Sequence, residues 1–158
     1  MSFGMQHQTD QRGEFIVSAD PARLDLDVIH RYLSEESFWA AGIPRDVLER
    51  AIAGSLCFGA YDGGKQVGFA RVVTDSATFA YLCDVFVLEP YRGRGLAKWL
   101  MECVIAHPSL QGLRRFVLVT KDAHGLYQKF GFMPLADPSG YMHIHNPNAY
   151  QAGPDSCS

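Results

Sequence analysis

The sequence has no excess of charge of either sign. Its 158 residues include 14 Lys and Arg against 17 Asp and Glu, a formal net charge of −3 at pH 7. Proteins that bind nucleic acid over a broad surface carry a strongly basic face, so this balance disfavours a nucleic-acid partner. Apolar runs of the about 20 residues needed to cross a membrane are also absent, which argues against a membrane partner. Any anion-binding site must therefore be local.

Cysteine is scarce and lacks a metal-binding spacing. Cys57, Cys83, Cys103 and Cys157 are scattered with no CxxC pair, and three of them lie inside apolar runs. This spacing predicts neither a zinc site nor a disulfide framework, so we expect buried free thiols and no metal. The polar start, MSFGMQHQTDQRGE, lacks the charged-then-apolar order of a signal peptide. The expected location is the cytoplasm.

The length predicts one compact domain with a hydrophobic core of its own. No internal repeat and no low-complexity linker divides the chain. We expect residues 13–146 to form this single domain. The polar ends, residues 1–12 and 147–158, are expected to be loosely ordered.

Apolar periodicity alternates between strand and helix spacing along the chain. Helical spacing predicts helices over 26–33, from Pro44 to about residue 52, over 95–107, and within AHGLYQKFGF (123–132). Strand patterns cover 15–18, 56–61, 66–74, 78–88 and 116–120, with short strands near 133–135 and 141–144. The turn signal DGGK and a polar turn near Asp75 join the three middle strands into an antiparallel meander. The order predicts an α/β fold: a mixed, mainly antiparallel sheet of about six to seven strands flanked by about four helices.

A turn rich in glycine and arginine, within EPYRGRGLAKWL (89–100), directly precedes the helix expected at 95–107. First-turn amides of a helix have no internal partner, and with the helix dipole they form a natural phosphate site. Gly93 and Gly95 allow close approach of the backbone to an anion, while Arg92 and Arg94 add positive charge. The spacing fits neither GxGxxG nor GK[ST], which excludes the two commonest nucleotide loops. The alternative is a plain surface turn that starts a core helix.

Two segments of the chain resemble the GNAT superfamily of acetyl-CoA-dependent N-acetyltransferases. RGRGLA (92–97) matches the family signature R/Q-x-x-G-x-G/A, and LYQKFGF (126–132) is similar to the family segment LYxKxGF. The resemblance spans roughly residues 15–144 and implies a GNAT-like acyltransferase fold. It also implies an activity: transfer of an acetyl group from acetyl-CoA to a primary amine of a small molecule or peptide, by direct attack in a ternary complex.

The resemblance further implies where acetyl-CoA binds. Backbone amides of the turn would hold the pyrophosphate, and the preceding strand residues would pair with the pantetheine arm through their backbone. A backbone N–H near Phe86 or Val87 could polarise the thioester carbonyl. Thr120 stands where the family often has an asparagine. The implied coenzyme-binding residues are Val85, Phe86, Val87, Arg92, Gly93, Arg94, Gly95, Leu96, Ala97, Lys98, Thr120 and Tyr127.

Amide formation needs a base for the amine and an acid for the leaving thiolate. By the resemblance, Tyr127 stands at the family's general-acid position. Several members carry a glutamate base where this chain has Tyr81, so the base is open. Asp84 is the nearest carboxylate, but on a regular strand it faces away from Tyr81 unless a bulge intervenes. A water relay, an already neutral amine and a purely structural Asp84 are the alternatives, and His124 is a second candidate proton carrier.

Acceptor recognition in this fold usually involves the segment between the first two helices and the middle of the strand before the turn. The corresponding residues here are Glu35, Phe38, Trp39, Phe79 and Tyr81. Aromatic rings beside carboxylates suit an amine, so a small-molecule amine is the expected partner. A homodimer is also considered, since family members commonly pair. The missing glutamate keeps a second class open, an acyl-CoA-binding regulatory or scaffold module with little turnover.

Overall fold

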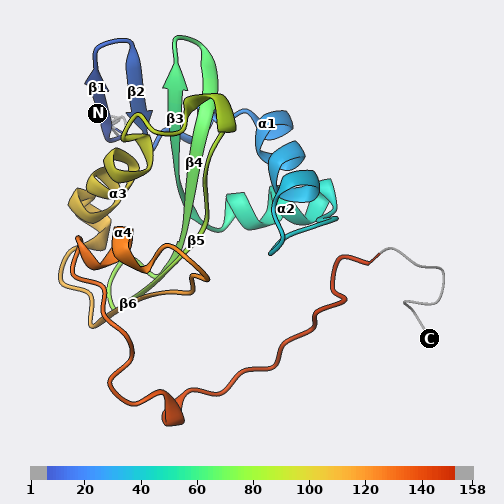
Figure 1. Ribbon diagram of the computed structural model, residues 1–158, viewed down its shortest axis with the longest axis vertical. Coiled ribbons are helices and arrows are strands. Elements are labelled where there is room, and N and C mark those ends of the chain that lie inside the picture. The colour runs from blue at the N-terminus through green and yellow to red at the C-terminus, as the bar shows by residue number, and fades with distance from the viewer. Residues whose placement is uncertain (1–6, 152–158) are drawn as a thin grey trace, which may run out of the picture.

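One mixed β-sheet organises the part of the chain that the structure, a computed structural model, describes: residues 7–151. The strands are β1 (Thr9–Arg12), β2 (Phe15–Ser18), β3 (Leu56–Asp62), β4 (Lys65–Thr74), β5 (Phe79–Val87) and β6 (Arg115–Leu118). They lie side by side in chain order, each antiparallel to its neighbour except β5 and β6, which run parallel. Figure 1 shows the resulting twisted sheet. The predicted α/β class with a mainly antiparallel mixed sheet is confirmed.

Helices cover both faces of this sheet (Figure 1). On one face lie α1 (Leu26–Arg31) and α2 (Arg45–Ala53), and on the other α3 (Leu96–Ala106) and α4 (His124–Gln128). The Asp25 carboxylate starts α1 by accepting from the backbone amides of Asp27 and Val28, and α1 continues into a π-helical turn over Tyr32–Glu36. Within residues 7–151, no helix has the length and apolar character of a membrane span.

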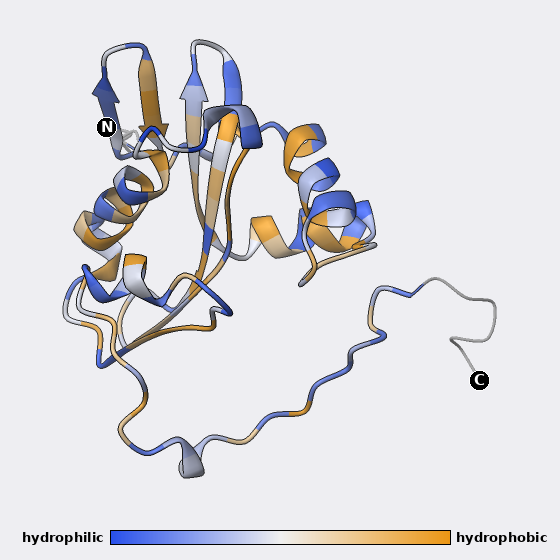
Figure 2. Ribbon diagram, in the orientation of Figure 1, coloured by the Kyte–Doolittle hydropathy of each residue, from blue (hydrophilic) through white to orange (hydrophobic). Residues whose placement is uncertain are grey.

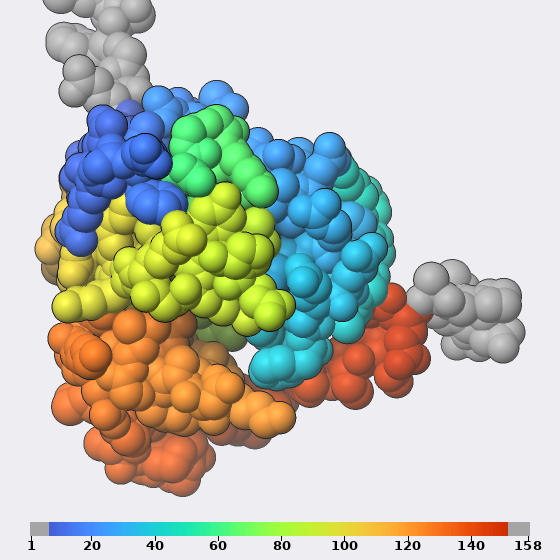
Figure 3. Space-filling view, turned by 45° about the horizontal axis from the view of Figure 1, so that its top comes forward, coloured from blue at the N-terminus to red at the C-terminus, as the bar shows by residue number. Residues whose placement is uncertain are grey.

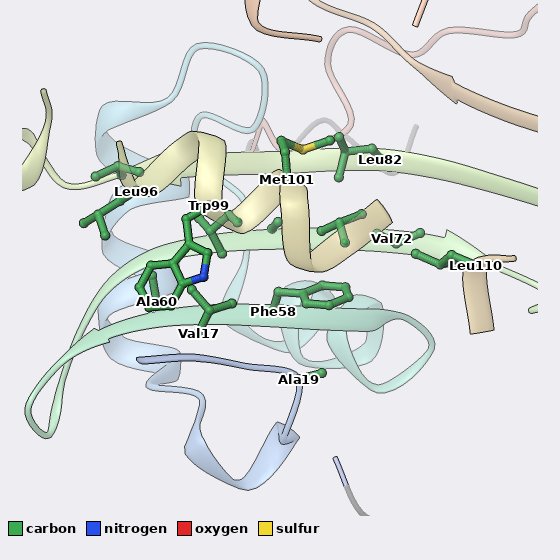
Figure 4. Close-up of a cluster of buried hydrophobic side chains, with 14 of the residues drawn as sticks. Val17, Ala19, Phe58, Ala60, Val72, Leu82, Leu96, Trp99, Met101 and Leu110 are labelled. Carbon is green, nitrogen blue, oxygen red and sulfur yellow. The ribbon is translucent and has the colours of Figure 1, made fainter. Parts of the chain in front are cut away.

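Two apolar cores form because alternate residues of the strands point to opposite faces. The larger lies under α3, where Leu96, Trp99 and Met101 point toward the strand residues Phe58 and Leu82 (Figure 4). The smaller lies under α1 and α2 and contains Ile29, Leu33, Leu48, Phe69 and Phe86. The sheet is therefore fixed from both sides.

A β-bulge interrupts β5 at Asp84. Phe69 pairs with Phe86 and Arg71 with Cys83, so Ala70 alone faces both Asp84 and Val85. Asp84 takes up the extra length with a positive φ of 55°. Across the bulge, the even-numbered and odd-numbered residues of β5 exchange the faces of the sheet to which they point. Before it, Leu82 packs in the α3 core, whereas after it Val87 does so and Phe86 packs under α1 and α2.

The first strand, β1, corrects the expectation of loose order for residues 9–12, the last part of the range 1–12. Figure 2 shows β1 as hydrophilic beside the apolar β2, and all four of its residues are exposed. Side-chain contacts with α3 hold it in place. The Trp99 indole N–H donates to the Asp10 carboxylate over 2.7 Å, and the Arg12 guanidinium lies 2.6 Å from the Glu102 carboxylate.

The strands predicted near 133–135 and 141–144 are wrong. These residues lie in a C-terminal arm, defined as residues 133–151, which is extended but pairs with none of the six strands. The arm leaves the end of α4, passes below the sheet and ends beside α2 (Figure 1). There Tyr150 packs against the core under α1 and α2. Residues 1–6 and 152–158, including Cys157, lie outside the described part.

Candidate active site

A cavity opens where β5 and β6 separate. The two strands pair only from Phe79 with Arg115 to Leu82 with Leu118, after which β5 continues alone past the bulge. The cavity has a volume of about 350 Å³. Figure 3 shows the opening between the orange segment around β6 and α4 and the cyan segment that follows α1. Its lining residues are Phe38, Trp39, Tyr81, Leu82, Cys83, Asp84, Val85, Leu118, Val119, Thr120, Lys121, Asp122, Ala123 and Tyr127.

Tyr127 enters this cavity from α4. Its ring packs edge-on against Phe132, with 6.1 Å between ring centroids, and its side chain is 9% exposed. Burial raises the pKa of Tyr127, and the Asp122 carboxylate raises it further. The phenol is therefore held in its protonated form at neutral pH, the form in which it can donate a proton.

Asp84 reaches the cavity from the bulge and belongs to a buried polar network. One carboxylate oxygen accepts from the Trp39 indole N–H over 2.8 Å, and the other from the Arg71 guanidinium over 2.8 Å. Arg71 also donates to the Ser55 hydroxyl over 3.0 Å. The Arg71 and Asp84 side chains are only 18% and 8% exposed. Both oxygens of Asp84 thus have a fixed partner, and Trp39 is held at the cavity wall.

The glycine-rich turn forms the entrance to α3. Gly93 and Gly95 have φ of 79° and 78°, and space is open where a Cβ atom would stand at either residue. The Trp99 amide makes the first helical hydrogen bond, to the Gly95 carbonyl over 3.0 Å, which leaves the preceding amides of Leu96, Ala97 and Lys98 without a helical partner. These amides and the open space above the glycines suit a phosphate group of a coenzyme.

The two arginines of the turn differ in their contacts. Arg92 turns toward the protein, where it donates to the Val87 carbonyl over 2.9 Å and to the Tyr32 hydroxyl over 3.0 Å. The Arg94 guanidinium lies 5.4 Å from the centre of the Tyr91 ring and makes no ion pair within residues 7–151. Arg94 therefore keeps its charge available at the turn, whereas Arg92 fixes the end of β5.

Comparison with known proteins decides the family. A family model described as the acetyltransferase (GNAT) family matches residues 26–132. The chain belongs to the GNAT acetyltransferase family. A Gibberella zeae protein with an inferred acetyltransferase function is 37% identical over 140 residues, covering 75% of this chain and 78% of the relative.

Solved structures of GNAT proteins resemble this chain in fold. The crystal structure of an inferred GNAT-family acetyltransferase from Xanthomonas campestris is 54% identical, with a TM-score of 0.85 over 87% of this chain and 97% of that one. Glucosamine-6-phosphate N-acetyltransferase from Arabidopsis thaliana is 15% identical, with a TM-score of 0.58 over 83% of this chain and 97% of that one. The second likeness concerns the fold alone.

The segment expected to pair with the pantetheine arm offers mainly its backbone. Phe86 and Val87 are buried in the cores on opposite faces of the sheet, while Val85 lines the cavity. Their side chains are thus occupied by packing, as in any central strand. Thr120 lines the cavity and also accepts from the Ala123 amide over 3.0 Å, which shapes the turn into α4.

The expected acceptor-binding residues separate into two groups. Phe38, Trp39 and Tyr81 line the cavity, and the Lys121 ammonium lies 5.4 Å from the centre of the Phe38 ring. Phe79 instead lines a neighbouring groove together with His124. Glu35 is exposed and does not line the cavity. Burial raises the pKa of Tyr81, and Cys83 and Asp84 add to the shift.

Arg71, which contacts Asp84 beside the cavity, is a residue that the sequence analysis missed, as are Lys121 and Asp122 in the cavity lining. It lies within the buried strand sequence QVGFARVV. A charged residue inside an apolar strand is rarely buried without a partner, so its position was itself a signal. Asp84, within LCDVFV one strand further on, is the matching charge. Pairing the isolated charges of adjacent strands would have predicted this ion pair.

Proposed function

We propose that this GNAT protein is an N-acetyltransferase that transfers the acetyl group of acetyl-CoA to a primary amine of a small molecule or peptide. The acceptor attacks directly while both substrates are bound. The observation that carries the proposal is the cavity, which is lined both by Tyr127 and by Asp84 and Val85 of the bulge in β5. The glycine turn at the start of α3 follows directly from that strand.

The residues of this chain suit the binding of coenzyme A. The amides of Leu96, Ala97 and Lys98, together with Arg94, would hold its phosphates at the turn. Backbone groups of Val85 and Phe86 would pair with the extended part of the molecule. Acetyl-CoA supplies an acetyl group activated as a thioester. The protein's part is to place that group next to the acceptor amine and Tyr127.

Tyr127 acts as the general acid in this proposal. Its buried phenol is protonated at neutral pH, because burial and Asp122 raise its pKa. It would donate that proton to the sulfur as the thiolate leaves, while a backbone N–H of β5 would stabilise the oxyanion. No metal takes part in the proposed reaction.

Asp84 has a structural role in this proposal rather than that of the base. Its two oxygens accept from Trp39 and Arg71, so neither is left free to accept a proton from the amine. The amine proton would instead leave to water in the cavity, or the acceptor would bind with its amine already neutral. Tyr81 lines the same wall and would orient the acceptor.

The test measures free thiol released from acetyl-CoA with a panel of polyamines, amino acids, aminoglycosides and peptide N-termini. At least one amine should support turnover. Tyr127→Phe should lower kcat by about 100-fold or more, the range of a lost general acid, while acetyl-CoA still raises the Tm. Tyr150→Phe, which alters a phenol outside the cavity, is the matched control and should leave kcat unchanged. An unchanged rate in Tyr127→Phe would refute the acid assignment.

The second candidate is an acyl-CoA-binding regulatory or scaffold module. The tyrosine at the position of the missing glutamate, with Asp84 already paired, is the observation that favours it. Both candidates predict that acetyl-CoA raises the Tm by binding the folded state. Only the enzyme releases thiol with an amine. Stabilisation by acetyl-CoA without turnover across the whole panel would select the module.

A further inference from the structure

Two loops meet across the mouth of the candidate catalytic cavity. Phe38 and Trp39 belong to the segment after α1, and Lys121 belongs to the loop between β6 and α4. These segments lie on the two sides of the opening in Figure 3. The Lys121 ammonium lies 5.4 Å from the centre of the Phe38 ring. The loops therefore place one positive charge beside an aromatic wall.

The aromatic wall has free surface. Phe38 is 71% exposed and Trp39 is 43% exposed, and their rings pack edge to face with 5.2 Å between centroids. Val119, which follows β6 and is 81% exposed, lines the same cavity. Large apolar side chains left open together at the mouth of a cavity are typical of a ligand-binding surface. The wall thus suits an apolar or aromatic part of the acceptor.

Lys121 keeps its charge available to a ligand. In the described part of the chain it makes no ion pair. Both Lys121 and Phe38 are exposed, and an exposed cation–π contact is weaker than a charge-assisted hydrogen bond to a carboxylate. A carboxylate on the acceptor would therefore bind Lys121 in preference to the Phe38 ring.

A second free charge stands next to Lys121. Asp122 lines the same cavity, and it pairs neither with Lys121 nor with any other cation among residues 7–151. It lies close enough to Tyr127 to raise the pKa of that phenol. An ammonium group drawn to Asp122 would thus lie beside the proposed general acid. Because Lys121 and Asp122 are adjacent in the chain, the two opposite charges of the acceptor should also be close together, as they are on an α-amino acid.

The lining offers little to a polycation. Of the described residues that line the cavity, only Asp84 and Asp122 carry a carboxylate, and both oxygens of Asp84 already have partners. Glu35, the carboxylate that the sequence suggested for binding an amine, lies outside the lining. Lys121 would repel a second ammonium group. Polyamines and aminoglycosides, which carry several ammonium groups, therefore fit this cavity poorly.

We propose that the acceptor is a free α-amino acid with an apolar or aromatic side chain. This inference rests on the proposed acetyl transfer and narrows its acceptor. Lys121 binds the α-carboxylate, and Asp122 draws the α-ammonium group toward Tyr127. The side chain of the amino acid lies against Phe38 and Trp39. The amine attacks the thioester once its proton has passed to water in the cavity.

The first test compares two acceptors that differ only in the carboxylate, L-phenylalanine and phenethylamine, by the rate of thiol release from acetyl-CoA. The unchanged protein should have a kcat/KM higher for phenylalanine by about tenfold or more, the strength of one charge-assisted hydrogen bond. Lys121→Met keeps an unbranched side chain against Phe38. It should raise KM for phenylalanine by a similar factor and leave the kinetics with phenethylamine unchanged.

Lys129→Met is the matched control for this comparison. It removes the same charge from an exposed residue at the end of α4 that does not line the cavity, so both acceptors should react as with the unchanged protein. Equal use of the two acceptors by the unchanged protein would overturn the proposal. A Lys121→Met variant that loses activity equally with both would do the same.

Two further variants test the other contacts. Asp122→Asn should raise KM for phenylalanine and phenethylamine alike, since both carry the amine. Phe38→Ser should raise KM for phenylalanine more than for alanine, whose methyl group has little surface to place against the ring. An Asp122→Asn variant with unchanged KM for both amines, or a Phe38→Ser variant that treats the two amino acids alike, would contradict these contacts.

A wrong acceptor and an absent acetyl transfer give different results. Thiol release with phenethylamine or a polyamine but not with phenylalanine would keep the enzyme and refute the amino acid. If no amine supports turnover, the acetyl transfer fails, and binding decides the rest. With coenzyme A present, phenylalanine should then raise the Tm of the unchanged protein more than phenethylamine does, and Lys121→Met should abolish the difference. Equal shifts, or no shift with phenylalanine, would refute the amino acid as a ligand.

Discussion

Replacement of Arg71 by methionine should destabilise the protein strongly, because it leaves the Asp84 carboxylate buried without its counter-charge. The two side chains are 18% and 8% exposed and their charged atoms lie 2.8 Å apart. Removal of one partner from a buried ion pair costs about 3–5 kcal/mol, and the partial exposure of Arg71 places this pair near the lower end. For a chain of this length, a loss of about 3 kcal/mol corresponds to a Tm lower by about 6–12 °C.

A double-variant cycle separates the pair from the packing of either side chain. Asp84→Asn keeps an acceptor for the Trp39 indole and suits the positive φ, which asparagine tolerates better than most residues. Arg71→Met combined with Asp84→Asn leaves no buried charge in the pair. The double variant should therefore melt above Arg71→Met alone, and the difference in free energy of unfolding is the coupling between the two residues.

The control for this cycle is Arg50→Met on α2. Arg50 lies 3.9 Å from the Asp46 carboxylate, and both side chains are more than 70% exposed, at 75% and 78%. An exposed pair of this kind contributes about 0–1 kcal/mol, so the Tm should barely change. If Arg71→Met melted as close to the unchanged protein as Arg50→Met does, the structural role of the pair would be refuted. Asp84 would then again be a candidate base.

Three further outcomes are expected. Gly95→Ala should lower the free energy of unfolding by about 1–2 kcal/mol from backbone strain alone, measured by urea denaturation, because φ is 78° and no atom crowds the new Cβ. Trp99→Phe removes the donor to Asp10, so amides of β1 should exchange with deuterium faster while α3 stays protected. In the proposed mechanism the acid form of Tyr127 is the active one, and its pKa is raised, so kcat should show no alkaline fall below about pH 10, the ordinary phenol value. A fall near pH 8 would contradict the proposed role.

The fold was predictable wherever burial follows a regular apolar period. β2 matches the predicted bounds, β3 to β6 and the first three helices differ from theirs by at most two residues at either end, and α4 lies within its predicted segment. The first strand, β1, was not predictable in this way, because the sequence TDQR has no apolar residue. Its position depends on Trp99 and Glu102, about ninety residues further along the chain. Contacts at that separation are invisible to a local pattern.

The residues of the candidate site were predictable only in part, and their arrangement was not predictable. The glycine turn and Tyr127 follow from short motifs, and the cavity brings Tyr127 together with Tyr81, Asp84 and Trp39. The bulge depends on how β4 and β5 pair, which no single strand sequence determines. The strands predicted in the C-terminal arm were wrong, because a strand period alone cannot show whether a segment will find a sheet edge to pair with.

The bulge at Asp84 also constrains how the length of β5 can change. Deletion of Asp84 would leave Ala70 facing Val85 alone, so the bulge would disappear while Phe86 still pairs with Phe69 and every later residue keeps its face of the sheet. Phe86 would keep its stacked contact with Tyr32, at 4.0 Å between ring centroids, whereas Trp39 and Arg71 would lose their shared carboxylate. The single extra residue therefore supplies the carboxylate without altering the pairing on either side of it, whereas one residue inserted after the bulge would turn Phe86 and Val87 to the wrong faces.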